Sequence, residues 1–339
     1  MPSKLSIIIV AHDRRNFIRY AIESALNQSI SREKYEVIVV KNFSSEEYDK
    51  TVQKMGVKII MTDEASLGSK LVLGIGRSEG EVLSFLEDDD EFEMDKVERV
   101  LDFFSRGRVA YYHNNYSVIA ENGTATRGAL PYSNKKNEKK FNIETEELKT
   151  ETINKAVKNG APFNLSCISI EKTIVAGKLD KLYNRNGAID YFMFYSALDS
   201  GMEIVIDNSL LTKYRVHPSN NSLVLTPDRK AFSLKKIEFF KDDLFTLQII
   251  QSMVKKKVVS DYIACRTLVP LLALSMLGLK DEKGKKGVTK IIRCIIKTRS
   301  EQVFALLTLN LVSKIFPHFG IWFYFNYESR KLRKLVGWI

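Results

Sequence analysis

The first hundred residues alternate between short apolar runs and amphipathic stretches. Four of the apolar runs are rich in β-branched residues, as the strands of a buried parallel sheet are. They cover residues 4–10, 35–40, 57–61 and 81–86. The intervening segments predict helices over 17–26 and near 45–55 and 68–77. Strand and helix in alternation indicate a doubly wound α/β sheet with crossover helices.

The pattern changes twice further along the chain. Residues 120–160 are polar and are expected to form a mobile loop. From about residue 162 the chain is expected to be ordered again, with strands at 204–207 and 210–218. After Pro227 the pattern is helical and basic, and no further strand is expected. We therefore expect two regions, 1–226 and 227–339.

Positive charge is concentrated in the C-terminal third. Residues 228–339 hold 22 Lys and Arg against 9 Asp and Glu, a net of +13, whereas residues 1–227 hold 30 against 32, a net of −2. The composition, 45% hydrophobic and 27% charged, excludes an intrinsically disordered protein. The charge predicts an anionic partner for the C-terminal third, either a membrane surface or nucleic acid.

The cysteines and the first residues bear on location. Cys167, Cys265 and Cys294 are far apart, odd in number and without metal-binding spacing, so we expect reduced core thiols and an intracellular protein. The start of the chain has a short apolar run without a cleavage site, so no signal peptide is expected.

One acidic run needs an explanation. Glu87, Asp88, Asp89 and Asp90 follow directly on the apolar run 82–86. Like charges in sequence repel one another, so the run is either a solvated turn or a place for a cation. Because ligands bind beyond the carboxyl ends of strands in such sheets, its position favours a functional site.

Four segments in order resemble the family 2 glycosyltransferases of the GT-A fold. They are the opening from Ser6, "SIIIVAHDRRNFIRYAIESALNQS"; residues 80–98, "GEVLSFLEDDDEFEMDKVE"; residues 189–201, "IDYFMFYSALDSG"; and residues 214–222, "YRVHPSNNS". In the last segment Tyr214, Arg215, His217 and Ser222 match the family pattern. The resemblance covers roughly residues 4–225. It implies a GT-A catalytic domain over 1–226, with a Rossmann-like, mostly parallel sheet and flanking helices, followed by an α-helical region over 227–339.

The resemblance also implies roles for the acidic run. The D-x-D motif of the family falls on Glu87, Asp88 and Asp89. Asp89 is expected to bind Mn²⁺ or Mg²⁺, Asp88 to lie against the sugar nucleotide, and Glu87 to have a supporting or ribose-binding role. A divalent ion on oxygen ligands neutralises the leaving nucleoside diphosphate. His217 is expected at the same metal, and an imidazole ligand favours Mn²⁺.

Asp190 matches the catalytic base of the family. The alternative is that Asp190 is a helix N-cap, because aspartate is common at helix starts. Ile189 stands before it in place of the usual Glu, and an apolar neighbour can desolvate the carboxylate and raise its basicity.

The donor and acceptor residues follow from the same resemblance. Ala11, His12 and Asp13 are expected at the donor, with His12 standing where the family often has Tyr. Asn42 replaces a family Asp and, being an amide, leaves both uracil and guanine open. Lys70 is expected to contact the diphosphate. The acceptor is expected to meet the segment that precedes the base, "APFNLSCISI" (161–170), at Asn164 and Ser166.

The C-terminal region combines apolar, aromatic and basic segments. Residues 267–279 are too short to span a membrane, and 303–327 are interrupted by polar residues and Pro317. Basic clusters beside aromatic-rich helices indicate peripheral association with an anionic membrane, here at the cytoplasmic face. The alternative is a helical lobe that packs on the catalytic domain.

Together these features predict an inverting, metal-dependent glycosyltransferase of the hexosyltransferase type. The donor is expected to be of the UDP or GDP type, and the acceptor a hydroxyl of a glycan or lipid-linked glycan. One alternative is a nucleotidyltransferase, which lacks support because no Gly-rich basic loop follows the first strand. The other is a nucleic-acid-binding protein led by the basic region. Its aromatic residues cluster with long aliphatic ones, which favours lipid, so no nucleic acid is expected.

Overall fold

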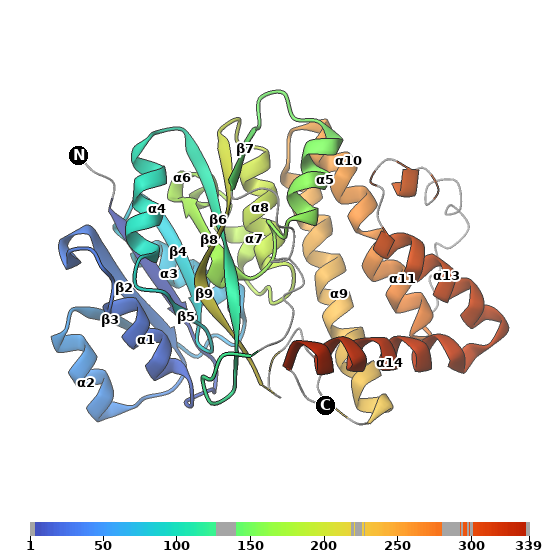
Figure 1. The fold of residues 1–339 in the computed structure, drawn as a ribbon, viewed down its shortest axis with the longest axis horizontal. Coiled ribbons are helices and arrows are strands. Elements are labelled where there is room, and N and C mark those ends of the chain that lie inside the picture. Colours follow the sequence, from blue (N-terminus) through green and yellow to red (C-terminus); the bar gives the residue numbers. More distant parts are fainter. Residues whose placement is uncertain are drawn as a thin grey trace.

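The structure is a computed structural model in which one sheet and a helical lobe pack together (Figure 1). It describes residues 4–126, 140–217, 220, 226, 228–279, 292, 294–296, 298 and 301–336. The sheet order is β3-β2-β1-β4-β8-β6-β9-β5, with β7 beside β9. The strands are β1 (Leu5–Val10), β2 (Tyr35–Lys41), β3 (Val57–Met61), β4 (Val82–Glu87), β5 (Glu91–Phe92), β6 (Val109–Ala120), β7 (Lys140–Glu144), β8 (Ile168–Glu171) and β9 (Glu203–Val216).

The first four strands are parallel, and β1, β2 and β4 are buried on both faces. β1 lies between β2 and β4, and β3 is at the edge. Side chains of a strand alternate between faces, so Ile8 and Val10 enter one core cluster while Ile7 and Ile9 enter the other. The connecting helices are α1 (Ile18–Leu26), α2 (Glu46–Lys54) and α3 (Leu67–Arg77), followed after β4 by α4 (Lys96–Ser105). The predicted strands and crossover helices of this half are confirmed.

Beyond β4 the sheet is mixed. β8 is antiparallel to both β4 and β6, and β6 is parallel to β9. The pattern gave no strand at β6, β7 or β8, and β9 joins two strands that were expected separately. β6 carries buried polar residues that interrupt its apolar pattern. One of them, Asn114, is fully buried and donates to Thr212 Oγ1 on β9 at 2.9 Å.

The expected loop over 120–160 is wrong for much of its length. It contains β7 and a helix, α5 (Thr150–Lys158), while 127–139 lie outside the described residues. Ile153 and Ala156, one helical turn apart, are buried in the core, and β7 pairs with β9. Two inward-facing residues in a polar helix give too little periodicity to be recognised in the sequence.

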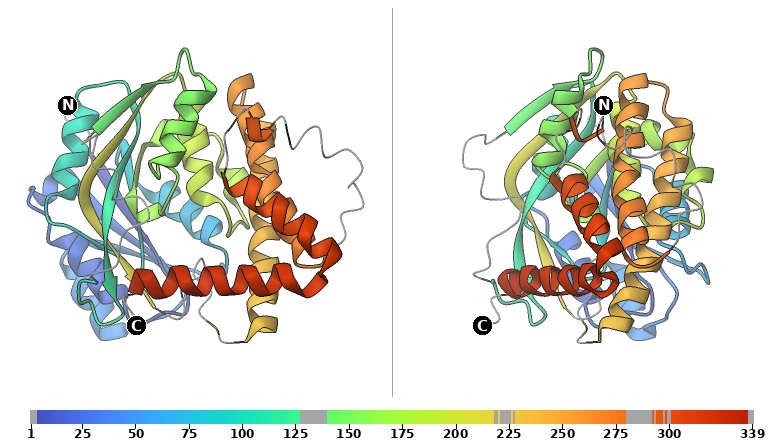
Figure 2. Two further views of the ribbon diagram at one scale, coloured as in Figure 1. Left: turned by 45° about the vertical axis from the view of Figure 1, so that its right-hand side comes forward. Right: turned by 90° about the vertical axis from the view of Figure 1, so that its right-hand side faces the viewer.

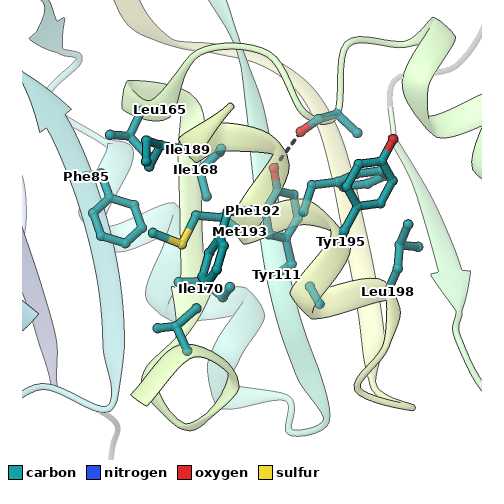
Figure 3. Packing of buried hydrophobic residues seen from close by; sticks show 14 of the residues in the cluster. Phe85, Tyr111, Leu165, Ile168, Ile170, Ile189, Phe192, Met193, Tyr195 and Leu198 are labelled. Carbon is teal, nitrogen blue, oxygen red and sulfur yellow. Dashed lines mark hydrogen bonds between the residues drawn. The ribbon is translucent and has the colours of Figure 1, made fainter. Parts of the chain in front are cut away.

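The helix α8 (Ile189–Leu198) is packed on every side. All but two of its residues are buried, and its aromatic side chains meet β6 and β8 of the sheet (Figure 3). The remaining short helices of this region are α6 (Lys172–Ala176) and α7 (Leu179–Leu182). A helix buried all round is held in one orientation, which matters because Asp190 is its second residue.

The C-terminal third is helical, as predicted, over the residues described. Its helices are α9 (Arg229–Met253), α10 (Lys257–Arg266), α11 (Leu268–Met276), α13 (Glu301–Ile315) and α14 (Pro317–Val336). α9 packs against α8, and α14 crosses the first half of α9 (Figure 2). At that crossing the ring of Phe232 lies 5.7 Å from Tyr324 and 5.2 Å from Phe325. The region therefore packs on the rest of the protein, as the helical-lobe alternative expects.

One segment of the described residues is long and apolar enough to cross a membrane. It covers Lys257–Met276, and 61% of its most apolar window is buried inside the protein. Core helices pass the same test of length and composition, so this finding is weak evidence for a membrane span.

The expectation of three reduced cysteines is wrong. Cys265 and Cys294 form a disulfide with a Cα–Cα distance of 5.3 Å, and Cys167 is a buried free thiol. Packing of the C-terminal helices brings together two residues 29 apart in sequence, which the spacing did not reveal. The cysteines therefore no longer support an intracellular location.

Phe192→Ala should destabilise the protein by roughly 3–5 kcal/mol, because it opens a cavity in a fully buried aromatic cluster. Leu234→Ala on α9 is the control, since Leu234 is 56% exposed and its loss should change stability by less than about 0.5 kcal/mol. Urea unfolding of both variants measures the difference. Equal stability would show that α8 is not a core helix.

Candidate functional site

The acidic turn, Glu87–Asp90, is buried where β4 ends. Asp88, Asp89 and Asp90 are exposed by only 1%, 6% and 1%. A solvated turn is therefore excluded. Since water does not screen these carboxylates, they need protons or positive partners.

The four carboxyl groups differ in pKa: three are raised and one is lowered. Burial first, and then the neighbouring acids, raise the pKa of Glu87 well above its ordinary value. Burial likewise raises the pKa of Asp88 and of Asp90 to about 7. Burial opposes ionisation of Asp89 too, but the hydrogen bond with His217 and the charge of Arg14 lower its pKa below the ordinary value. Asp89 is thus the permanent anion of the turn.

Arg14 is the cation that pairs with this anion. Its guanidinium donates to Asp89 Oδ2 at 2.6 Å and also to Asp88 Oδ1. Burial alone would lower the pKa of Arg14, but Asp89, Asp88 and Glu87 raise it, so the guanidinium stays charged. The sequence reasoning assigned no role to Arg14. Its signal was present in the opening motif, directly after Ala11, His12 and Asp13.

His217 reaches the acidic turn from β9. Its Nε2 lies 3.0 Å from Asp89 Oδ2 and 3.3 Å from Arg14 Nη1. The ring packs on Phe17 with centroids 4.7 Å apart, and the side chain of Asn220 accepts from the His217 backbone N–H at 2.7 Å. The structure thus brings together Asp89 and His217, the two expected metal ligands. Ser222, the last residue of that motif, lies outside the described residues.

The donor set at this turn suits a divalent ion only in part. No cluster of three His, Cys, Asp or Glu side chains that could hold a metal occurs among the residues described. Two hard or borderline donors, Asp89 and His217, do converge, and the buried Asp88 Oδ2 has no hydrogen-bond partner. Mg²⁺ and Mn²⁺ are often held by one or two protein ligands together with substrate phosphates and water. The residues therefore fit an ion whose coordination a diphosphate completes.

Residues behind the turn fix its shape. Arg215, which is almost fully buried, donates from its backbone N–H to Asp90 Oδ1 at 3.0 Å and from Nε to the Asp89 carbonyl at 2.9 Å. Asn164 donates to Asp90 Oδ2 at 3.0 Å, and Ser166 Oγ accepts from the Glu87 N–H at 3.0 Å. The two residues expected at the acceptor are therefore already engaged with the acidic turn, and any acceptor contact would share them.

The expected donor residues gather at the carboxyl ends of β1 and β2. Asp13 and Asn42 form a reciprocal pair, with Asp13 N donating to Asn42 Oδ1 at 2.9 Å and Asn42 Nδ2 donating to Asp13 Oδ1 at 2.7 Å. His12 Nδ1 lies 2.8 Å from Lys70 Nζ, and Ala11 is buried against β2. Burial lowers the pKa of Lys70, while Asp13 and Asp88 oppose that shift. The charge of Asp88 thus acts on Lys70, which shows that this cluster lies near the acidic turn.

Asp190 is not a helix N-cap. The cap residue of α8 is Ala188, and Asp190 Oδ1 accepts from the N–H of its own neighbour Tyr191 at 2.9 Å. Burial raises the pKa of Asp190 to about 7, with a contribution from Asp243, although Arg266 acts in the opposite direction. A carboxylate with this pKa can accept a proton near neutral pH.

The loop before Asp190 is tied to the helix that carries Lys70. Gly68 N donates to the Arg185 carbonyl at 2.7 Å, and Leu67 N donates to Asn186 Oδ1 at 2.8 Å. Ile189 and Leu165 share one core cluster with Phe85 of β4 (Figure 3). These contacts join the loop before Asp190 to the start of α3, whereas the charged side chains that act on Asp190 itself are Asp243 and Arg266 of the C-terminal helices.

Backbone strain is concentrated in these same segments. Five described non-glycine residues have a positive φ, and four of them belong to the site or its loops: Asp13, Asn164, Asn184 and Ala188. Each such conformation costs about 1–3 kcal/mol and persists where the surroundings impose it, often at functional sites.

Known proteins resemble this chain in sequence and in fold. Residues 6–170 match the profile of "Glycosyl transferase family 2". An "Uncharacterized glycosyltransferase" of Rickettsia bellii is 34% identical over 36% of this chain, and the putative teichuronic acid biosynthesis glycosyltransferase TuaG of Bacillus subtilis is 25% identical over 35%. The matches span only 18% and 49% of those relatives.

A solved structure gives the fold. Staphylococcus aureus TarS 1–349 in complex with UDP-GlcNAc superposes with a TM-score of 0.57 at 14% identity, over 89% of this chain and 83% of that one. The predicted GT-A fold with a helical C-terminal region is thereby confirmed.

The wild type should lose stability as the pH rises, because of Asp190, and Asp190→Asn should remove that loss. Folding raises the pKa of Asp190 from 3.8 to about 7, so its contribution is most favourable below the unfolded value and is lost as the pH rises through about 7. Because the side chain is partly accessible, we expect roughly 1–3 kcal/mol rather than the ~4 kcal/mol of a fully dry site.

Urea unfolding of both proteins at pH 5 and pH 8 measures this effect. The variant should gain stability relative to the wild type at the higher pH, and Asp63→Asn, at an exposed position, should not. A difference that does not change with pH would contradict the raised pKa.

Proposed function

Because the chain belongs to glycosyl transferase family 2 through residues 6–170, we propose that it transfers a sugar from a nucleotide-sugar donor to a hydroxyl acceptor. The observation that carries the proposal is the convergence of Asp88, Asp89 and His217 at the carboxyl end of β4, beside the donor cluster. Ligands of open α/β sheets bind at this edge. A buried anionic turn there suits a cation and a diphosphate better than a neutral ligand.

The donor is proposed to be a hexosyl nucleoside diphosphate of the UDP or GDP type. Support comes from TarS, which was solved with UDP-GlcNAc and with UDP. Asn42 and Asp13 face the base, His12 stacks on it, and Ala11 lets it approach the backbone. Lys70 contacts the diphosphate, and Asp88 and Glu87 the ribose and sugar. Burial raises the pKa of Glu87 well above its ordinary value, which favours the protonated carboxyl group, and a protonated carboxyl group can donate a hydrogen bond.

Asp89 and His217 are proposed to hold Mn²⁺ or Mg²⁺. When bound there, the ion would supply positive charge to the departing diphosphate. The rest of the mechanism belongs to the side chains. Asp190 removes the proton of the acceptor hydroxyl, which then attacks the anomeric carbon opposite the leaving group, so the configuration inverts. The bond to the diphosphate oxygen breaks in the same displacement.

The acceptor is proposed to be a glycan or lipid-linked glycan, meeting the site beside Asn164 and Ser166. Two Bacillus subtilis relatives are named for such products: TuaG for teichuronic acid biosynthesis and GgaA for minor teichoic acid biosynthesis. Both names support a glycan acceptor.

The C-terminal helices are proposed to rest on an anionic membrane at its cytoplasmic face. Large apolar side chains are exposed on α13 and α14. They include Phe304, Leu311, Phe319, Trp322, Phe323 and Tyr327, with Phe316 between the two helices. α14 runs along the lower edge of the molecule, where the carboxyl ends of the parallel strands also lie (Figures 1 and 2). A membrane at this edge would bring a lipid-linked acceptor close to the acidic turn.

A thermal-shift panel of nucleotide sugars, with and without Mn²⁺, tests the donor class. A ligand that binds the native state raises apparent stability by RT ln(1 + [L]/Kd). The expected result is a shift with a UDP or GDP sugar that Mn²⁺ increases. No shift with any nucleotide sugar would reject the proposed function.

Substitutions separate the two key carboxylates. Asp89→Asn should abolish Mn²⁺-dependent donor binding, because the permanent anion of the turn is lost. Asp190→Asn should keep donor and Mn²⁺ binding but lower turnover by ~10²–10⁴-fold, because the amide cannot accept a proton. In the wild type, kcat/KM should fall as the pH drops below about 7, where Asp190 becomes protonated. Near-normal turnover of Asp190→Asn, or loss of its donor binding, would refute the assignment.

Membrane contact is tested by co-sedimentation with vesicles. The wild type should bind vesicles that contain an anionic phospholipid, and Trp322→Ser with Phe323→Ser should weaken binding, since both side chains are more than 40% exposed. Leu234→Ser removes an apolar side chain from α9 that is 56% exposed, more than either of these two, and is the matched control. Equal binding of all three proteins would remove α14 from the membrane contact.

A further inference from the structure

We infer that Arg14 is a built-in counter-cation: it occupies the cation position of the acidic turn in the donor-free protein and leaves it when a nucleoside diphosphate and a divalent ion bind. This inference rests on the proposed function for the identity of the ligands. The proposed function assigns no role to Arg14.

The same atoms serve Arg14 and the proposed metal site. The guanidinium lies 2.6 Å from Asp89 Oδ2 and 3.3 Å from His217 Nε2, and it also pairs with Asp88. A guanidinium has five N–H donors and no lone pair, so it cannot join the coordination of a metal ion. An ion held by Asp89 Oδ2 and His217 Nε2 would stand directly beside this guanidinium, and the repulsion between the two cations opposes their binding together. Divalent ion and Arg14 therefore bind Asp89 alternately.

The turn needs a cation when the donor is absent. Asp88 and Asp89 are exposed by 1% and 6%, so unpaired charges there would lack both water and a partner. Arg14 satisfies one oxygen of each carboxylate, while Asp88 Oδ2 is buried without a hydrogen-bond partner. The pairing is thus incomplete, and the turn retains an acceptor for a further ligand.

Arg14 is placed so that it can leave. Its side chain is 27% exposed, and it lies in the loop between β1 and α1, after Asp13, which has a φ of 58°. The Asp13–Asn42 pair holds this loop beside the expected nucleotide, so a guanidinium that turns outward meets the diphosphate. Arginine binds phosphate oxygens in the same forked geometry as carboxylates. One side chain would then exchange carboxylate partners for phosphate partners.

This exchange couples the two ligands. A divalent ion alone must displace Arg14 into solvent, whereas the diphosphate offers the displaced guanidinium a new partner. Free ion should therefore bind weakly without nucleotide and more tightly with it, and by linkage each ligand strengthens the other.

The test is Mn²⁺ binding to the full-length protein, followed by electron paramagnetic resonance without nucleotide and with saturating UDP or GDP. Arg14→Gln removes the charge but keeps polar length, so it should bind Mn²⁺ about tenfold more tightly than the wild type without nucleotide. Arg19→Gln is the control, because Arg19 is an exposed α1 residue paired with Glu23. With UDP or GDP the gain should shrink, since the variant lacks the phosphate contact.

Equal Mn²⁺ affinity of Arg14→Gln and wild type without nucleotide would overturn the inference. If that variant fails to fold, the wild type alone decides, because Mn²⁺ affinity that is the same with and without UDP and GDP also overturns it. The proposed function fails separately. Tighter Mn²⁺ binding by Arg14→Gln in a protein that binds no nucleotide sugar would leave the counter-cation standing without the transferase.

Discussion

The structure depends on how four carboxyl groups are accommodated at the end of one buried strand. Desolvation is the largest effect on each of them, and no group in the turn could be ionised without a partner. The partners come from distant segments: Arg14 after β1, Asn164 and Ser166 before β8, and Arg215 and His217 at the end of β9. The sheet supplies them together because β4 lies between β1 and β8, and β5, which follows the turn, pairs with β9. The strand order is therefore also the condition for the site.

The same reasoning explains which features the sequence revealed. The first four strands were predictable because each is a continuous β-branched run, and the acidic turn because it directly follows one of them. β6 was missed because residues such as Asn114 are polar yet buried, and their hydrogen bonds lie on another strand. Arg14 was missed because its role arises from contact with residues 74 and 75 positions away. The Cys265–Cys294 disulfide and the Arg14–Asp89 salt bridge both join residues far apart in sequence, and local periodicity does not predict such pairs.

The C-terminal helices also contact both ends of the segment that carries Asp190. Asp242 of α9 accepts from the N–H of Asn186 at 3.0 Å and from that of Gly187, just before Asp190. At the other end of α8, Asp199 accepts from the N–H groups of Lys255 and Lys256 at 2.9 and 2.7 Å. Helix α8 is thus held at both ends by residues beyond position 227. A contact of the C-terminal helices with a membrane would act on the segment that presents Asp190, so the two regions cannot be treated as independent.

Two aspartates illustrate how environment assigns chemistry. Asp89 and Asp190 are the same residue type and both suffer desolvation, yet burial raises the pKa of Asp190 to about 7 whereas Arg14 and His217 keep the pKa of Asp89 below its ordinary value. The first can take up a proton near neutral pH, and the second stays an anion for a cation to bind. Arg266 also acts on Asp190, but it donates to Tyr191 and is shared with Asp243, so it leaves the Asp190 carboxylate without a pairing cation among the described residues. The two aspartates therefore differ because Arg14 pairs with Asp89, whereas no cation pairs with Asp190 among the described residues.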